Sequence, residues 1–170
     1  LNLIKEFNPQ ICFHLAAQSS VVVSVGDPLL DFEHNILQPV QLIKTLLTTD
    51  CSKFVFTSSG GTIFGEPNIL PTSEEDFAGE PESPYGIGKK KLNEIITSMT
   101  IDTHMSYSIL NLSNVYGPRQ DPHGEAGVVS IFSNKILNNE KPIIYGDGKQ
   151  TRDYIYAVSY THLTLPTSSR

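Results

Sequence analysis

The chain has 170 residues, of which 39% are hydrophobic and 18% are charged, so it can bury one sizeable core and is neither disordered nor fibrous in composition. Its formal net charge of -6 argues against a large basic surface for nucleic acid. No apolar stretch approaches the roughly 18 residues that span a bilayer, so we expect a cytoplasmic protein without membrane or nucleic-acid partners.

The first elements are a strand and a helix. The apolar run Ile11–Leu15 is typical of a buried strand. Asp27-Pro28 predicts a helix start, because aspartate can cap a helix and proline at its first position needs no donor. Apolar residues then recur at helical spacing as far as Leu47. Pro39 falls inside this pattern, and its missing N–H, which would bond the carbonyl of Asn35, predicts a kink.

The same alternation continues along the chain. Lys53–Thr57 predicts a second strand, and the proline-rich, acidic stretch Glu66–Pro84 predicts a surface loop. A second helix is expected over Ser83–Met99, a third strand over Tyr107–Leu110 and a third helix over about 126–137. Alternating strands and helices are typical of an α/β fold in which helices cover both faces of a parallel sheet.

Tyr85 and Lys89 stand four residues apart, on one face of the second predicted helix and separated by one turn. Tyrosine ionises near pH 10, so its use as a base at neutral pH requires about 4 kcal/mol of stabilisation of the anion, which a nearby ammonium can supply. The alternative is a half-buried aromatic ring beside a solvated charge. Gly86 and Gly88 disfavour a helix interior, and we interpret them as marks of close approach, for instance by a ligand.

Two strand ends carry further polar or small residues. Thr57-Ser58-Ser59 lies where a strand gives way to a glycine-containing turn, and ligands of open parallel sheets bind beyond the carboxyl ends of strands. Ordinary turn sequence is the alternative. His14–Ser19 follows the first strand in the same way, and its small residues would let a flat ligand approach the backbone, although a simple strand-to-loop junction explains them equally well. We interpret His14 itself as a core residue.

Metal binding is not expected. The sequence has no cluster of histidine, cysteine and acidic residues with the spacing of a metal site. Cys12 and Cys51 are far apart and each lies beside an apolar run, so we expect buried thiols in a reducing compartment rather than a disulfide or a metal pair.

Taken together, these motifs resemble the NAD-dependent epimerase/dehydratase family of extended short-chain dehydrogenases/reductases, close to the bacterial UDP-glucose 4-epimerases. The resemblance covers Leu1 to about Tyr156. The matching segments are His14–Gln18, Asp27-Pro28, Asn35, Lys53–Gly65, Ser83–Lys89, Asn114–Arg119 and Gly146–Tyr154.

The resemblance implies roles for individual residues. Tyr85 would be the catalytic base, Lys89 would lower its pKa and hold the nicotinamide ribose, and Ser59 would bond the reacting hydroxyl, with Ser58 as the alternative. The implied cofactor is NAD, bound by Leu15, Ala16, Ala17, Gln18, Asn35, Ser58, Tyr85, Lys89 and Ser113. The implied UDP-sugar contacts are Ser59, Tyr85, Asn114 and Arg152.

The implied reaction is epimerisation of a UDP-hexose at C4 through a 4-keto intermediate, in a full-length homodimer. Dehydratases of this branch carry an Asp-Glu pair just after the catalytic hydroxyl, where this chain has Gly60-Gly61-Thr62. That difference favours epimerisation. A dehydratase or reductase of the same branch is the alternative enzyme, and a non-catalytic nucleotide sensor or an inactive fragment is the alternative of another class.

The resemblance also implies a partial, Rossmann-like, doubly wound parallel sheet that lacks the amino-terminal βαβ units, so we expect the chain alone to hold NAD poorly and to be inactive. We expect residues 1–118 to be the carboxyl-terminal portion of the NAD-binding domain and residues 119–156 to begin the smaller nucleotide-sugar-binding region. Residues 158–167 resemble a translated sequencing adapter, so we expect residues 157–170 to be a non-native tail, with a divergent strand and loop as the alternative.

Overall fold

The computed structural model describes residues 1–67, 69–73, 79–123 and 127–161. The chain forms two compact units, Leu1–Leu112 and Ser113–Arg170, and each is described by itself. The expected helix start at Ala126 and positions 162–170 of the expected tail lie outside the described residues. The predicted functional boundary at residue 118 stays a prediction.

The first unit is built on a parallel sheet of three strands in the order β1-β2-β3. These are β1 (Ile11–His14), β2 (Lys53–Ser59) and β3 (Ser106–Leu112). His14 is paired with Phe56, and Ser59 with Leu112. Because the strands are parallel, their carboxyl ends meet at one edge of the sheet, as the sequence predicts.

Local capping chemistry explains where the longer helices of this unit begin. The Asp27 side chain accepts the N–H of Leu30 and Pro28 opens the helix, while the Ser83 side chain accepts the N–H of Gly86. Both helix starts agree with the prediction. The helical elements of the unit are α1 (Asn2–Phe7), α2 (Val21–Gly26), α3 (Pro28–Phe32), η1 (Glu33–Leu37), α4 (Gln38–Leu46) and α5 (Pro84–Thr100).

The helix departs from regular α-helical geometry next to Pro39, as predicted, but it does so through a π-helical turn and not through a kink. The segment η1 is a π-helical turn, in which the N–H of Gln38 donates to the carbonyl of Glu33. A π turn widens the helix by one residue, so the proline ring and its missing donor are accommodated without ending the helix. The helical run therefore continues from Pro28 to Leu46 as α3, η1 and α4.

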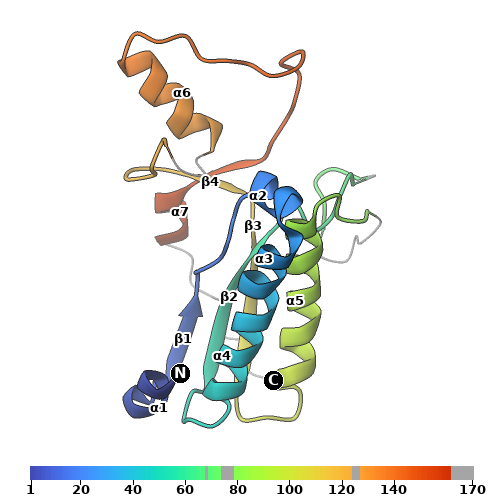
Figure 1. Cartoon of the computed structure of the whole chain (residues 1–170), viewed down its shortest axis with the longest axis vertical. Coiled ribbons are helices and arrows are strands. Elements are labelled where there is room, and N and C mark those ends of the chain that lie inside the picture. The colour runs from blue at the N-terminus through green and yellow to red at the C-terminus, as the bar shows by residue number, and fades with distance from the viewer. Residues whose placement is uncertain (68, 74–78, 124–126, 162–170) are drawn as a thin grey trace. The chain divides into compact units, whose positions relative to one another are not determined.

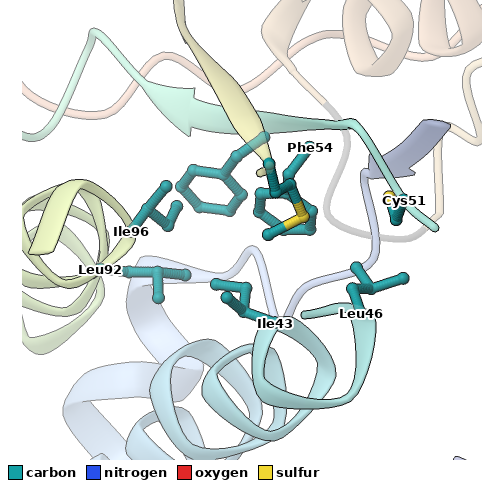
Figure 2. Close-up of a cluster of buried hydrophobic side chains, with 8 residues drawn as sticks. Ile43, Leu46, Cys51, Phe54, Leu92 and Ile96 are labelled. Carbon is teal, nitrogen blue, oxygen red and sulfur yellow. The ribbon is translucent and has the colours of Figure 1, made fainter. Parts of the chain in front are cut away.

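The core lies between the sheet and the helices. Figure 1 shows α3, α4 and α5 along one side of the three strands. Figure 2 shows side chains from α4, β2 and α5 meeting in this core, among them Ile43, Phe54 and Leu92, which are fully buried. On the opposite sheet face Phe13 is 61% exposed. Of the two helical layers expected, the described residues of this unit supply one.

The second unit contains a two-stranded parallel ladder and two helices. Strand β4 (Asn114–Tyr116) pairs with β5 (Tyr154–Tyr156), and the helices are α6 (Val128–Leu137) and α7 (Ala157–Thr161). None of its described side chains is fully buried. None of the helices among the described residues combines the length and the hydrophobicity that a membrane-spanning helix requires.

Candidate active site

Tyr85 and Lys89 lie on the first turns of α5, beside the end of β2. Tyr85 is 8% exposed and Lys89 only 3%, so Lys89 is not the solvated charge, nor Tyr85 the half-buried ring, of the alternative interpretation. The Lys89 Nζ donates to the carbonyl oxygen of Thr57 at 3.2 Å. This bond ties the amine to the strand that carries the predicted catalytic hydroxyls.

Aromatic rings surround the amine. The Lys89 Nζ lies 4.7 Å from the centroid of the Phe56 ring and 5.8 Å from that of Tyr85, distances at which a ring face attracts a cation. Burial lowers the pKa of Lys89 to about 8, against the opposing attraction of the Asp31 carboxylate. The amine is therefore mostly protonated at neutral pH and places a positive charge beside Tyr85.

His14 belongs to the same layer, as the sequence predicts. Its ring stacks on Phe54 and Phe56, with centroids 6.0 and 5.9 Å apart. Burial, and then the nearby Lys89 ammonium, lower the pKa of His14. The imidazole is therefore neutral at physiological pH and adds no second cation to the site.

The two serines of β2 differ in their surroundings. Successive side chains of a strand point to opposite faces, so Ser58 shares the face of Phe54 and Phe56, toward the helices. Ser58 is 5% exposed, and its Oγ has no hydrogen-bond partner among the described residues. Ser59 ends the strand, is half-buried, and accepts the N–H groups of Thr62 and Ile63 at its carbonyl. Both predicted hydroxyls thus lie at the sheet edge.

Glycines allow the turn after β2 to pack tightly. A Cβ on Gly86 would lie 2.8 Å from the carbonyl oxygen of Thr62, and a Cβ on Gly60 would lie 2.8 Å from that of Asn111. A Cβ on Gly88 would lie 3.4 Å from Asp31 Oδ2. The close approach at Gly86 is made by the protein's own backbone, whereas a Cβ on Gly88 would be in ordinary van der Waals contact with Asp31. A ligand beside either glycine stays a prediction.

The expected cofactor residues of the first unit gather after β1. Leu15, Ala16 and Ala17 are exposed in the loop that leaves the strand, while Asn35 is buried on η1. The Asn35 Nδ2 donates to the backbone carbonyl of Gln18 at 2.9 Å, and its Oδ1 has no partner among the described residues. Open small residues and unbonded buried acceptors suit a flat ligand with hydroxyl groups, so the residues present fit NAD.

Asp31 is a buried residue that the sequence interpretation missed. It is 1% exposed, and its Oδ1 accepts from Gln18 Nε2 at 2.7 Å and from Asn35 Nδ2 at 2.8 Å. The local sign of it in the sequence is its position four residues before Asn35, which places the two side chains on the same helical face.

The remaining predicted contacts belong to the second unit. Ser113 precedes β4, which begins at Asn114, and Arg152 lies two residues before β5. The Asn114 side chain and backbone N–H both donate to the carbonyl of Asp153 at 3.0 Å, so the parallel ladder brings Asn114 near Arg152. A hollow of about 500 Å³ beside α6 is lined by neither of them.

No metal site accompanies these residues in the part of the chain that the structure describes. Groups of three or more histidine, cysteine or acidic side chains suited to a metal ion do not occur among those residues.

The sequence of the chain was compared with those of known protein families. The model of the NAD dependent epimerase/dehydratase family matches residues 1–165. The chain belongs to this family. Its fold is accordingly part of a Rossmann-like, doubly wound α/β sheet, and the family's cofactor is NAD.

Similar proteins include several epimerases. A putative UDP-glucose 4-epimerase of Methanocaldococcus jannaschii is 46% identical over 147 residues, which cover 86% of this chain and 48% of that protein. A UDP-glucose 4-epimerase of Mycolicibacterium smegmatis is 46% identical over 155 residues, 91% of this chain and 49% of the relative. The chain thus spans about half the length of these curated relatives.

Solved structures give the same result. The UDP-glucose 4-epimerase of Thermotoga maritima with UDP-glucose superposes with a TM-score of 0.88 at 40% identity, covering 91% of this chain and 50% of the other. The Thermus thermophilus enzyme in complex with NAD gives a TM-score of 0.82 at 40% identity, covering 91% and 51%. These experimental structures therefore support the fold that the family match assigns to the chain.

Proposed function

We propose that the whole protein epimerises a UDP-hexose at C4, of the UDP-glucose/UDP-galactose type, through a 4-keto intermediate. The observation that carries this proposal is the buried Lys89 amine beside the ring of Tyr85 at the carboxyl edge of a parallel sheet. The names of the two 46%-identical relatives support the reaction and the sugar nucleotide.

The roles of the side chains follow from their positions. Tyr85 removes the proton of the sugar C4 hydroxyl, and Lys89 stabilises the resulting tyrosinate because its ammonium is held beside the ring. Ser59, or Ser58 in its place, donates a hydrogen bond to the reacting oxygen. NAD, when bound, supplies the hydride chemistry. The burial of Tyr85 and Lys89 excludes water and strengthens their interaction.

Sugar-nucleotide binding is assigned to the second unit. We propose that Asn114 and Arg152 contact the diphosphate and uridine, since the guanidinium fork suits phosphate oxygens and Arg152 is exposed. The proposed homodimer is supported by apolar side chains that α3 leaves in water, such as Leu29, which is 81% exposed. Light scattering of the whole protein should give a molar mass twice that of one full-length chain.

The test uses the whole protein loaded with NAD. It should interconvert UDP-glucose and UDP-galactose, or their N-acetyl or uronic acid relatives, and Tyr85→Phe should lower kcat about a hundredfold or more with NAD still bound. Tyr107→Phe, on an exposed β3 tyrosine, is the matched control.

The other outcomes distinguish the alternatives. A 4-keto-6-deoxy product would identify a dehydratase instead. Unchanged behaviour of Tyr85→Phe would favour a non-catalytic nucleotide sensor. Comparison of Ser58→Ala with Ser59→Ala then assigns the hydroxyl, because the variant that loses turnover while NAD stays bound marks the group that touches the substrate.

A further inference from the structure

A carboxylate is buried directly behind the proposed proton-transfer pair. Asp31 is 1% exposed on α3, which packs against α5. Ionised carboxylates are almost never buried without partners, because removing them from water costs several kcal/mol. The contacts of Asp31 should therefore show what its charge is used for.

The two carboxylate oxygens face different partners. Oδ1 accepts from the side-chain amides of Gln18 and Asn35, at 2.7 and 2.8 Å. Oδ2 faces α5, because a Cβ on Gly88 would lie 3.4 Å from it. Gly88 immediately precedes Lys89, so the carboxylate lies beside the part of the helix that carries the buried amine.

Among the described groups around Lys89, Asp31 is the one that carries the opposite charge. Asp31 on α3 raises the pKa of Lys89, His14 on β1 has its own pKa lowered by Lys89, and Tyr85 lies on the same helix as Lys89. His14 is neutral at physiological pH for the reasons given above, and the Thr57 carbonyl and the Phe56 ring are uncharged. Among the described residues, Asp31 is thus the acid whose charge favours the ammonium form of Lys89.

We propose that Asp31 is a positioning residue, whose buried charge keeps Lys89 protonated beside Tyr85 and whose second oxygen fixes the Gln18 and Asn35 amides at the cofactor edge. The role toward Tyr85 and the cofactor rests on the proposed function. The coupling between Asp31 and Lys89 does not, and it can be measured without turnover.

The first experiment follows the Lys89 Cε resonance by NMR in the 170-residue chain labelled with 13C-lysine, with Lys89→Arg to assign the signal. In Asp31→Asn, which keeps an oxygen acceptor but loses the charge, the ratio of protonated to neutral Lys89 at pH 8 should fall at least about threefold. Glu33→Gln removes an exposed charge from the same helical run and should leave the ratio unchanged. An unchanged Lys89 titration in Asp31→Asn would overturn the proposal.

A double-mutant cycle covers the case in which Asp31→Asn unfolds the chain. Asp31→Asn should lower the folding equilibrium constant at least about tenfold when Lys89 is present, because it leaves an uncompensated buried cation, and less than about threefold in the Lys89→Met background. Equal losses in both backgrounds would refute the coupling.

The pH profile of the NAD-loaded whole protein links this coupling to function. Since only protonated Lys89 stabilises the tyrosinate, the alkaline limb of kcat should move to lower pH in Asp31→Asn. If the NMR shift is found but Tyr85→Phe remains active, the proposed function fails and the Asp31–Lys89 coupling stands. If Tyr85→Phe is inactive but the NMR titration does not move, the function stands and the role of Asp31 is wrong.

Discussion

The Lys89 amine contacts a carbonyl acceptor on Thr57 and the ring face of Phe56, and the charge of Asp31 raises its pKa without a direct ion pair. Burial nevertheless dominates, and the pKa of the amine falls from the ordinary 10.5 to about 8. A folded state that binds the proton less tightly than the unfolded chain gains stability as the pH rises between these two values.

The buried amine therefore makes stability depend on pH. Between pH 7 and 9.5, the free energy of unfolding of the wild type should rise by about 2 kcal/mol relative to that of Lys89→Met, because the unfolded wild type retains a Lys89 proton that the folded chain releases. Chemical denaturation at both pH values measures the difference. Lys91→Met, whose ammonium stays in water on the same helix, is the control. A difference that does not change with pH would contradict the assigned burial of Lys89.

Contacts between residues that are close in the sequence could be predicted from it, and contacts between distant residues could not. The shared face of Tyr85 and Lys89 follows from their spacing alone. The bond between Gln18 and Asp31 joins a loop to a helix across 13 residues, and its existence depends on how α3 packs. No local pattern encodes that packing, so Asp31 escaped the sequence interpretation.

At the scale of elements, tight contacts determine where α5 can begin. Its first turn packs against the turn after β2 so closely that Gly86 has no room for a side chain. The caps Asp27 and Ser83 were readable because a cap is a local hydrogen bond. The ladder between β4 and β5 was not, because Asn114 and Tyr154 lie far apart in the sequence.

Gly86→Ala should destabilise the chain, although alanine is the better helix former by about 1 kcal/mol. The added Cβ would lie 2.8 Å from a backbone oxygen, and the resulting displacement should cost about 1–3 kcal/mol. Gly26→Ala in α2, where no atom lies within 4 Å of the new Cβ, is the matched control and should be neutral or stabilising. Denaturant midpoints of both variants test this, and equal midpoints would rule out the close contact.

At the scale of the whole molecule, burial is distributed unevenly. The fully buried side chains of the described residues all lie in the first unit, whereas the second unit holds a short ladder and helices without one. Local stability follows buried apolar contacts, so the two units should differ in how often they open.

Hydrogen exchange should resolve this difference in a single sample. Amides of β2 and α5 should exchange slowly, and those of β4, β5 and α6 should exchange within the earliest time points, because few buried contacts oppose their opening. Mass spectrometry of peptides from both units measures the two rates under identical conditions. Protection of β4 and β5 equal to that of β2 would contradict the expectation.

The π turn Glu33–Leu37 has a consequence for insertions and deletions. It holds one residue more than an α-helical path between the same ends, and each residue of a helix advances about 100° around the axis. A deletion of one residue there would leave a regular helix of ordinary propensity, yet it would rotate Asn35 or Ile43 away from its neighbours, depending on which end stayed fixed. The apparent irregularity is therefore what keeps the polar edge of α3 and the apolar face of α4 in phase.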